Sequence, residues 1–138
     1  MFRKIAAFAV VLSLALPVIS PVARKIDPVS ERAIAEMICA EGGDYPLICR
    51  LALAAVVFNR VDSDGYPDDV PGVLADVGAF PKYADSNGFS DVEINEALHI
   101  VYAAEYGIDP SFGAVTFSRE QLGGTPTLAA GGMFFYCR

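Results

Sequence analysis

The sequence has no tryptophan, a single histidine and only three cysteines among its 138 residues. Zinc sites are usually built from four Cys, His or carboxylate ligands, and no CxxC pair is present to begin one. The sequence pattern identifies no serine or cysteine as a partner for His99, which argues against a Ser–His–Asp triad. The sequence therefore indicates no metal site and no cofactor.

Basic residues are also scarce. Lys and Arg total 10 against 17 Asp and Glu, which gives a net charge of −7. Proteins that track nucleic-acid phosphates are normally basic, so nucleic acid is not an expected partner. Apolar residues make up 54% of the chain, too large a share for a disordered protein. The length suits one domain, and the sequence shows no internal repeat.

The first 23 residues have the order of a secretory signal peptide. Arg3 and Lys4 supply positive charge, an apolar run from Ile5 to Leu16 follows, and Pro17 breaks that run. The alternative is an uncleaved anchor, because the uncharged stretch is just long enough to span a membrane. Both interpretations place the rest of the chain outside the cytoplasm, secreted or in the cell envelope.

Residues 24–138 then form one expected domain. It meets a membrane only through the leader, if the leader is retained. Loss of Arg3 and Lys4 with the leader would change the net charge from −7 to −9.

The remaining pattern predicts three helices followed by a small β-hairpin, an α+β domain that is mostly helical. Helix-capping residues, helix-ending glycines and apolar spacing place the helices at Asp27–Glu41, Pro46–Val61 and Asp91–Tyr106. The second helix is apolar nearly all round, so we expect it to be buried at the centre. Shorter features are an apolar piece at Val70–Val77, a loop at 78–90, and strands at Ala114–Phe117 and Met133–Cys137.

Export makes a disulfide between Cys39 and Cys49 possible, which would close a short loop. The alternative is that all three cysteines are small buried apolar residues.

Glu41 is a charged residue on the apolar face of the first predicted helix. It follows Ile34 by seven residues and Ile38 by three, spacings that put all three on one face. Burial and the negative end of the helix dipole both favour the protonated acid there. Such an acid can protonate the leaving oxygen of a glycosidic bond. The alternative is that Glu41 merely ends a frayed helix.

Ala40-Glu41-Gly42-Gly43-Asp44 is followed, at a fitting interval, by an apolar helix that ends in Asn59-Arg60-Val61. These segments resemble the A-E-A-x-G-E and N-R-V motifs of the SleB-type cell wall hydrolases, the spore-cortex-lytic family. Further similar segments, in the same order, are Tyr66–Pro67, Gly72–Leu74, Gly78–Phe80, Asp109–Phe117 and Gly132–Tyr136. The resemblance extends from about Ile34 to Arg138.

The resemblance implies a lysozyme-like domain that cleaves peptidoglycan glycan strands, with Glu41 as the catalytic acid. It favours lytic transglycosylation at the bond between N-acetylmuramic acid and N-acetylglucosamine, because one carboxyl group suffices for that reaction. Hydrolysis needs a second carboxylate, for which Asp44, Asp68 and Asp76 are the candidates. A non-catalytic wall-binding or accessory protein of the same fold is the further alternative.

The chain departs from the family pattern at several positions. Tyr45 stands where the family has its second acid, Arg50 replaces a glutamine, and Met133 replaces a histidine. Ser118-Arg119 stands where the family has Asn-Pro. The departures put substrate contacts in question more than they do Glu41.

Four residues are expected to contact substrate. Sugar faces pack against aromatic rings, which selects Phe117 and Tyr136 on the predicted strands and Tyr45 after the first helix. Asp44 lies in the same turn as Tyr45. At −9, the mature domain should not be drawn to an anionic wall by charge, so a targeting protein is a possible partner.

Overall fold

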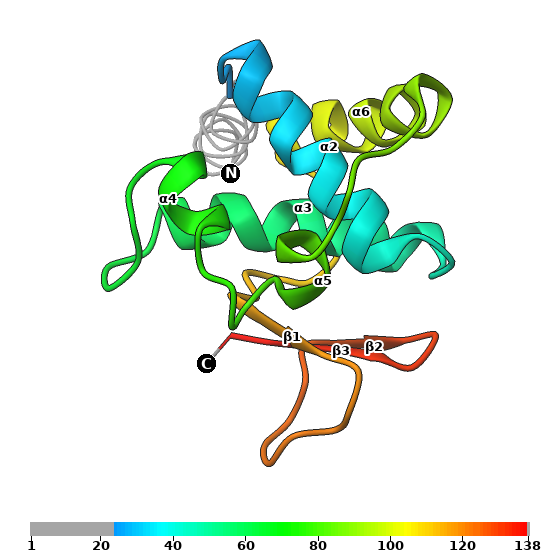
Figure 1. Cartoon of the computed structure of the whole chain (residues 1–138). Helices are drawn as coiled ribbons and strands as arrows, with labels where there is room; N and C mark the ends of the chain where they lie inside the picture. The colour runs from blue at the N-terminus through cyan, green and yellow to red at the C-terminus, as the bar shows by residue number, and fades with distance from the viewer. Residues whose placement is uncertain (1–23, 138) are drawn as a thin grey trace, which may run out of the picture.

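Helices are the main regular structure of the described chain, and a three-stranded sheet closes one side (Figure 1). The structure is a computed structural model that describes residues 24–137, so the expected leader at 1–23 lies outside the described residues. The elements are α2 (Pro28–Gly42), α3 (Leu47–Val61), α4 (Val70–Leu74), α5 (Pro81–Ala84), α6 (Asp91–Glu105), β1 (Thr116–Ser118), β2 (Leu128–Ala130) and β3 (Met133–Tyr136).

Helix α3 is the central element, as its apolar sequence predicted. Every residue from Ala52 to Phe58 is buried. The helix packs against α2, α4, α6 and β1, and in Figure 1 it crosses between the other long helices and the sheet. None of the helices in residues 24–137 is long and apolar enough to cross a membrane.

Helix α2 begins as predicted and ends one residue later than predicted, at Gly42. The Asp27 side chain accepts the N–H of Ser30 at 2.9 Å and caps the first turn. Gly42 was expected to stop the helix but is its last residue. A Cβ on Gly42 would lie 2.7 Å from Cδ1 of Leu53, so its lack of a side chain is what lets α3 approach.

Helix α6 also starts as expected, because Ser90 and Glu93 form a capping box. The Ser90 hydroxyl accepts the N–H of Glu93 at 3.3 Å, and Glu93 Oε2 accepts the N–H of Ser90 at 2.9 Å. Ile94 and Val101 are buried on this helix, which packs against α2 and α3.

The predicted hairpin is one part of a larger sheet. Strand β2 was not predicted; it lies between the two predicted strands, in a stretch rich in Gly, Thr and Pro, and it pairs antiparallel with β3. Strand β1 pairs with the other edge of β3, which gives the order β1-β3-β2. The four-residue helix α5 was likewise missed within the expected loop at 78–90, because one turn shows no apolar period.

The turn between β2 and β3 packs on the start of α3. Gly131 has φ +57° and Gly132 has φ +84°. A Cβ on Gly131 would lie 2.7 Å from Cδ of Pro46, whereas one on Gly132 would meet no atom within 4 Å. The thiol of Cys49 also donates to the carbonyl of Ala130 at 3.1 Å. The hairpin is thereby fixed to α3.

Two carboxyl groups share a buried position between α2 and α6. Glu31 and Glu105 are both buried. Burial raises the pKa of Glu105 to about 7, and a hydrogen bond and the charge of Glu31 act in the same direction against the smaller opposing effect of Lys25. Glu105 is therefore largely protonated in the folded protein below neutral pH.

Gly131→Ala should destabilise the protein more than Gly132→Ala. Both replacements strain a positive-φ position at a cost of about 1 kcal/mol, but only Gly131→Ala also pushes a methyl group into Pro46. Urea unfolding of both variants measures the difference. Equal losses, or a greater loss in Gly132→Ala, whose φ is the less favourable, would show that the contact with Pro46 does not limit this turn.

The free energy of unfolding should fall as the pH rises from about 5 to 8. The pKa of Glu105 is higher in the folded chain than its ordinary 4.5, so the folded state binds more protons in this range and loses its advantage as they leave. The loss is at most on the order of 3 kcal/mol. Glu105→Gln should flatten this dependence and be the more stable protein at pH 8, whereas the exposed control Glu120→Gln should follow wild type. A wild-type profile that is level over this range would contradict the assignment.

Candidate active site

Glu41 lies where the end of α2, the start of α5 and the end of β1 meet. Its side chain has no exposed surface, as its place on the apolar face predicted. Glu41 Oε1 accepts the backbone N–H of Lys82 at 2.8 Å and that of Tyr83 at 3.0 Å, both from the first turn of α5. Helix α5 therefore matters to the site although it is only four residues long.

The second carboxylate oxygen of Glu41 is paired with Arg119. Arg119 Nη2 lies 2.7 Å from Glu41 Oε2 and 2.8 Å from the Glu41 carbonyl oxygen. Arg119 directly follows β1, 78 residues along the chain from Glu41. Sequence reasoning identified this arginine only as a departure from the family pattern, because nothing local to it indicates so distant a partner.

The partners of Glu41 were not predicted from the sequence. Two N–H groups of α5 and the Arg119 guanidinium bind its carboxylate oxygens, and so replace the water lost on burial with hydrogen bonds and an opposite charge. As the site stands in this structure, Glu41 is enclosed and ion-paired.

Two of the predicted substrate residues border Glu41 through Arg119. The centre of the Arg119 guanidinium lies 5.8 Å from the ring centroid of Tyr45 and 5.9 Å from that of Phe117. Phe117 also packs on Phe80 at 5.8 Å and on Phe135 at 6.3 Å between centroids. Both rings are only partly buried, so each keeps some surface beside the site.

The other two predicted substrate residues lie differently. Tyr136 is buried, and its hydroxyl accepts the N–H of Leu122 at 2.8 Å. This hydrogen bond fixes the loop that follows Arg119. A buried ring does not fit the expected contact with a sugar. Asp44 is exposed in the turn after α2. Its substrate contact stays a prediction.

The candidates for a second carboxylate do not converge on Glu41. Asp76 binds Arg60 Nη1 at 3.3 Å and accepts the N–H groups of Gly78 and Ala79, so it shapes its own loop. Asp68 is exposed between α3 and α4. Within residues 24–137, the groups hydrogen-bonded to the Glu41 carboxylate are N–H donors.

Three of the departures from the family pattern form one connected set. The ring of Tyr45 lies beside the Arg119 guanidinium, and Arg50 Nε donates to the carbonyl of Tyr45 at 3.2 Å. Arg119 in turn binds Glu41. Met133, by contrast, is fully buried in the core, where it acts as packing.

The Asn-Arg pair at the end of α3 positions the segment that leads into β1. Asn59 Nδ2 donates to Asp109 Oδ2 at 3.0 Å and to the Ala114 carbonyl at 2.9 Å. Arg60 Nε donates to the Val115 carbonyl at 2.6 Å. Burial acts to raise the pKa of Asp109, but hydrogen bonds from Ser111, Asn59 and the turn backbone outweigh it and lower that pKa. These motifs build the turn that brings β1 and Arg119 to Glu41.

The disulfide between Cys39 and Cys49 is not formed. Both residues, like Cys137, are free thiols. The Cys39 thiol donates to the Glu93 carbonyl on α6 at 3.6 Å, and the Cys49 thiol is directed to Ala130 on β2. The two side chains thus point to different elements. Burial raises the pKa of both thiols, so they remain protonated near neutral pH.

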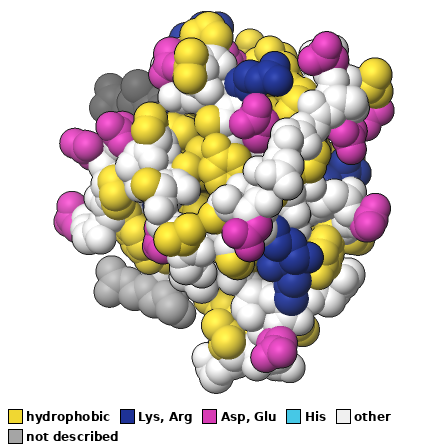
Figure 2. All heavy atoms as spheres, in the orientation of Figure 1, with side chains coloured by type: hydrophobic (Ala, Val, Ile, Leu, Met, Phe, Trp, Pro, Cys, Tyr) yellow, Lys and Arg dark blue, Asp and Glu magenta, His cyan; other side chains and the backbone are white. Residues whose placement is uncertain are grey.

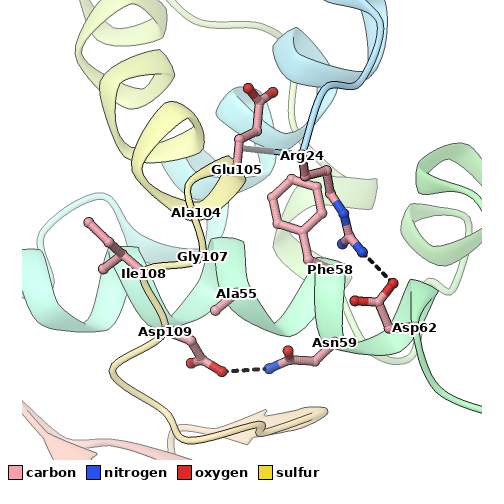
Figure 3. Close-up of a pocket in the computed structure, with 10 residues that line it drawn as sticks. All are labelled: Arg24, Ala55, Phe58, Asn59, Asp62, Ala104, Glu105, Gly107, Ile108 and Asp109. Atoms are coloured by element: carbon pink, nitrogen blue, oxygen red, sulfur yellow. Dashed lines mark hydrogen bonds and ion pairs between the residues drawn. The ribbon is translucent and has the colours of Figure 1, made fainter. Parts of the chain in front are cut away.

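A cavity of about 230 Å³ lies away from Glu41, at the meeting of α3 with the end of α6 (Figure 3). Arg24 pairs with Asp62 on one side of it, and Asn59 reaches Asp109 on the other. Arg24, Asp62 and Asp109 are thus engaged with protein partners, whereas Oε1 of Glu105, which also lines the cavity, has none. Glu41 is not among the residues that line it.

On the face shown in Figure 2, Lys and Arg side chains lie in a few separate places among scattered Asp and Glu, and no basic band crosses it. Within residues 24–137, no group of three or more His, Cys, Asp or Glu side chains is placed to hold a metal ion.

Comparison with known proteins connects this site to a family. The family model described as Cell Wall Hydrolase matches residues 46–134, which begin just after Glu41. A spore cortex-lytic enzyme of Halalkalibacterium halodurans is 33% identical over 61% of this chain, and one of Bacillus subtilis is 30% identical over 77%. The chain spans only 25% and 36% of the length of these two relatives.

Solved structures show the same fold. The catalytic domain of the Bacillus cereus SleB protein has a TM-score of 0.68 at 23% identity, with 83% of this chain and 94% of that one covered. The catalytic domain of SleB from Bacillus anthracis, described as a germination-specific lytic transglycosylase, has a TM-score of 0.68 at 24% identity, with 83% and 98% covered. The mostly helical α+β fold is confirmed. Because the family model matches well over half of its length, this chain belongs to the cell wall hydrolase family.

Proposed function

We propose that this protein is an exported enzyme that cleaves the glycan strands of peptidoglycan, with Glu41 as its catalytic acid. The observation that supports this most is the position of Glu41. A buried carboxylate lies at the end of α2 where α5 and β1 converge, with the rings of Tyr45 and Phe117 beside its partner Arg119. In a chain of the cell wall hydrolase family, this is the arrangement expected of a general acid bordered by sugar-binding surfaces.

The proposed reaction is lytic transglycosylation. Protonated Glu41 gives its proton to the glycosidic oxygen between N-acetylmuramic acid and N-acetylglucosamine, and the bond from C1 to that oxygen breaks. The C6 hydroxyl of N-acetylmuramic acid then bonds to C1 and returns its proton to the Glu41 carboxylate. The products are a 1,6-anhydro sugar end and a free hydroxyl, and no water is consumed.

A hydrolytic muramidase of the same fold is the alternative. It would need a second carboxylate to activate water or to act as nucleophile. Asp76 is engaged in its own loop, and Asp44 is exposed in the turn after α2. Lytic transglycosylation needs only the carboxylate of Glu41, which is why we propose it first.

One observation favours a non-catalytic accessory role as the second candidate. Glu41 has no exposed side-chain surface, and Arg119 occupies one of its oxygens. A wall-binding protein could keep this closed arrangement permanently. An enzyme has to open it.

Export and targeting belong to the same proposal. We infer that residues 24–138 are the catalytic unit and that the leader at 1–23 directs it to the cell envelope. The acidic charge gives no attraction to an anionic wall, so a targeting protein is expected to bring the domain to its substrate. The names of the relatives make spore cortex the first wall preparation to test.

Glu41→Gln should abolish the release of soluble fragments from purified peptidoglycan. The amide keeps the shape of the side chain but cannot supply the proton, so the rate should fall by about a hundredfold to ten-thousandfold. Mass spectrometry of the fragments provides the measurement. The matched control is Glu36→Gln on the same helix, which should leave the rate and the products unchanged.

The chemical nature of the fragment ends distinguishes the candidate functions. Anhydro ends from wild type indicate transglycosylation, whereas reducing ends indicate a hydrolase and would overturn that part of the proposal. If wild type releases nothing from spore cortex or from vegetative wall, the enzyme proposal fails and the accessory role takes its place.

A further inference from the structure

The proposed reaction requires Glu41 to touch the substrate oxygen, which the structure does not allow as it stands. The carboxylate oxygens are bonded to two backbone N–H groups and to Arg119, and the side chain has no exposed surface. Some group must therefore move before the reaction begins.

Arg119 is the group that separates Glu41 from solvent. Its side chain is 26% exposed, whereas that of Glu41 is 0% exposed. Its guanidinium binds both Oε2 and the carbonyl of Glu41 and lies beside the rings of Tyr45 and Phe117. An arginine in this position covers the carboxylate, and its positive charge balances the negative charge of the carboxylate.

The closed position of Arg119 is incompletely satisfied. Its Nε is buried and makes no hydrogen bond, which carries a cost of about 1–3 kcal/mol for a buried donor. Arg119 also begins the segment that leads to β2, of which residues 120–125 are exposed. An unsatisfied donor at the start of an exposed segment is easier to displace than a fully bonded core side chain.

The other elements around Glu41 do not supply a competing charge. Helix α5 contributes the backbone N–H groups of Lys82 and Tyr83, while the Lys82 side chain is exposed. From α3, Arg50 is held by the carbonyl of Tyr45. Among the described residues, Arg119 is the cation paired with the Glu41 carboxylate.

We propose that Arg119 is a positioning residue that keeps Glu41 enclosed, and that its displacement opens Glu41 to the substrate. This inference rests on the proposed function for the second half of its claim. The first half concerns Glu41 alone and is measurable without catalysis.

Arg119→Gln should open Glu41 to reagents and to substrate, because a neutral side chain cannot form the ion pair with the carboxylate. Arg119→Lys keeps the charge and should stay close to wild type. The matched control Arg32→Gln removes an exposed arginine that pairs with Glu36 on α2, and it should leave the exposure of Glu41 unchanged. A purely structural role for Arg119 would lower stability without changing the exposure of Glu41 in the folded protein.

Carbodiimide labelling gives a readout that does not depend on activity. With glycine ethyl ester as the nucleophile, peptide mass spectrometry follows Glu41 and the exposed Glu120 in the same molecule. In folded wild type, Glu41 should label at least tenfold more slowly than Glu120, and Arg119→Gln should remove most of that protection. This comparison within wild type holds even if Arg119→Gln does not fold.

The outcomes separate the two proposals. If Glu41 labels as fast as Glu120 in wild type, or if folded Arg119→Gln keeps the wild-type labelling rate, the role of Arg119 is overturned. If wild type and Arg119→Gln both fail to cleave peptidoglycan while the labelling difference appears, the proposed function fails and the enclosure by Arg119 stands. Release of fragments by Arg119→Gln alone would support the enclosure by Arg119 and overturn the proposed function of the wild-type protein.

Discussion

A buried carboxylate and the cation that neutralises it are the constraint on which this architecture depends. Removing an ion from water costs several kcal/mol unless hydrogen bonds and an opposite charge replace the lost solvent. Glu41 obtains two N–H groups from α5 and a guanidinium from the residue after β1. Three segments far apart in sequence must therefore meet within hydrogen-bonding distance, and much of the fold can be understood as the means by which they do.

The central helix α3 connects these segments. Near its start it packs closely against the end of α2, which Gly42 permits by having no side chain. At its far end, Asn59 and Arg60 hold the carbonyls of Ala114 and Val115 and so fix where β1 begins. The turn between β2 and β3 rests on the first residues of the same helix. One buried helix thus sets the position of both the acid and the strand that brings its cation.

The sequence predicted the parts of this arrangement that depend on local signals. Capping residues and apolar spacing located the three long helices, and the place of Glu41 on an apolar face predicted its burial. The elements it missed, α5 and β2, are four and three residues long, too short for a period to appear. The role of Arg119 could not be predicted, because that role depends on Glu41, which lies 78 residues away in the sequence.

The cost of the ion pair also bears on what the site is for. Replacing a buried ion pair by apolar side chains of similar size is often neutral or stabilising. Stability alone therefore gives little reason for a charge at Glu41, and a purely structural role would be met as well by an apolar residue. The departures from the family pattern at Tyr45, Arg50 and Arg119 surround Glu41 without removing it, and they are joined to one another by contacts. In this chain they determine which groups hold the Glu41 carboxylate, which fits the proposal that Arg119 controls access to it.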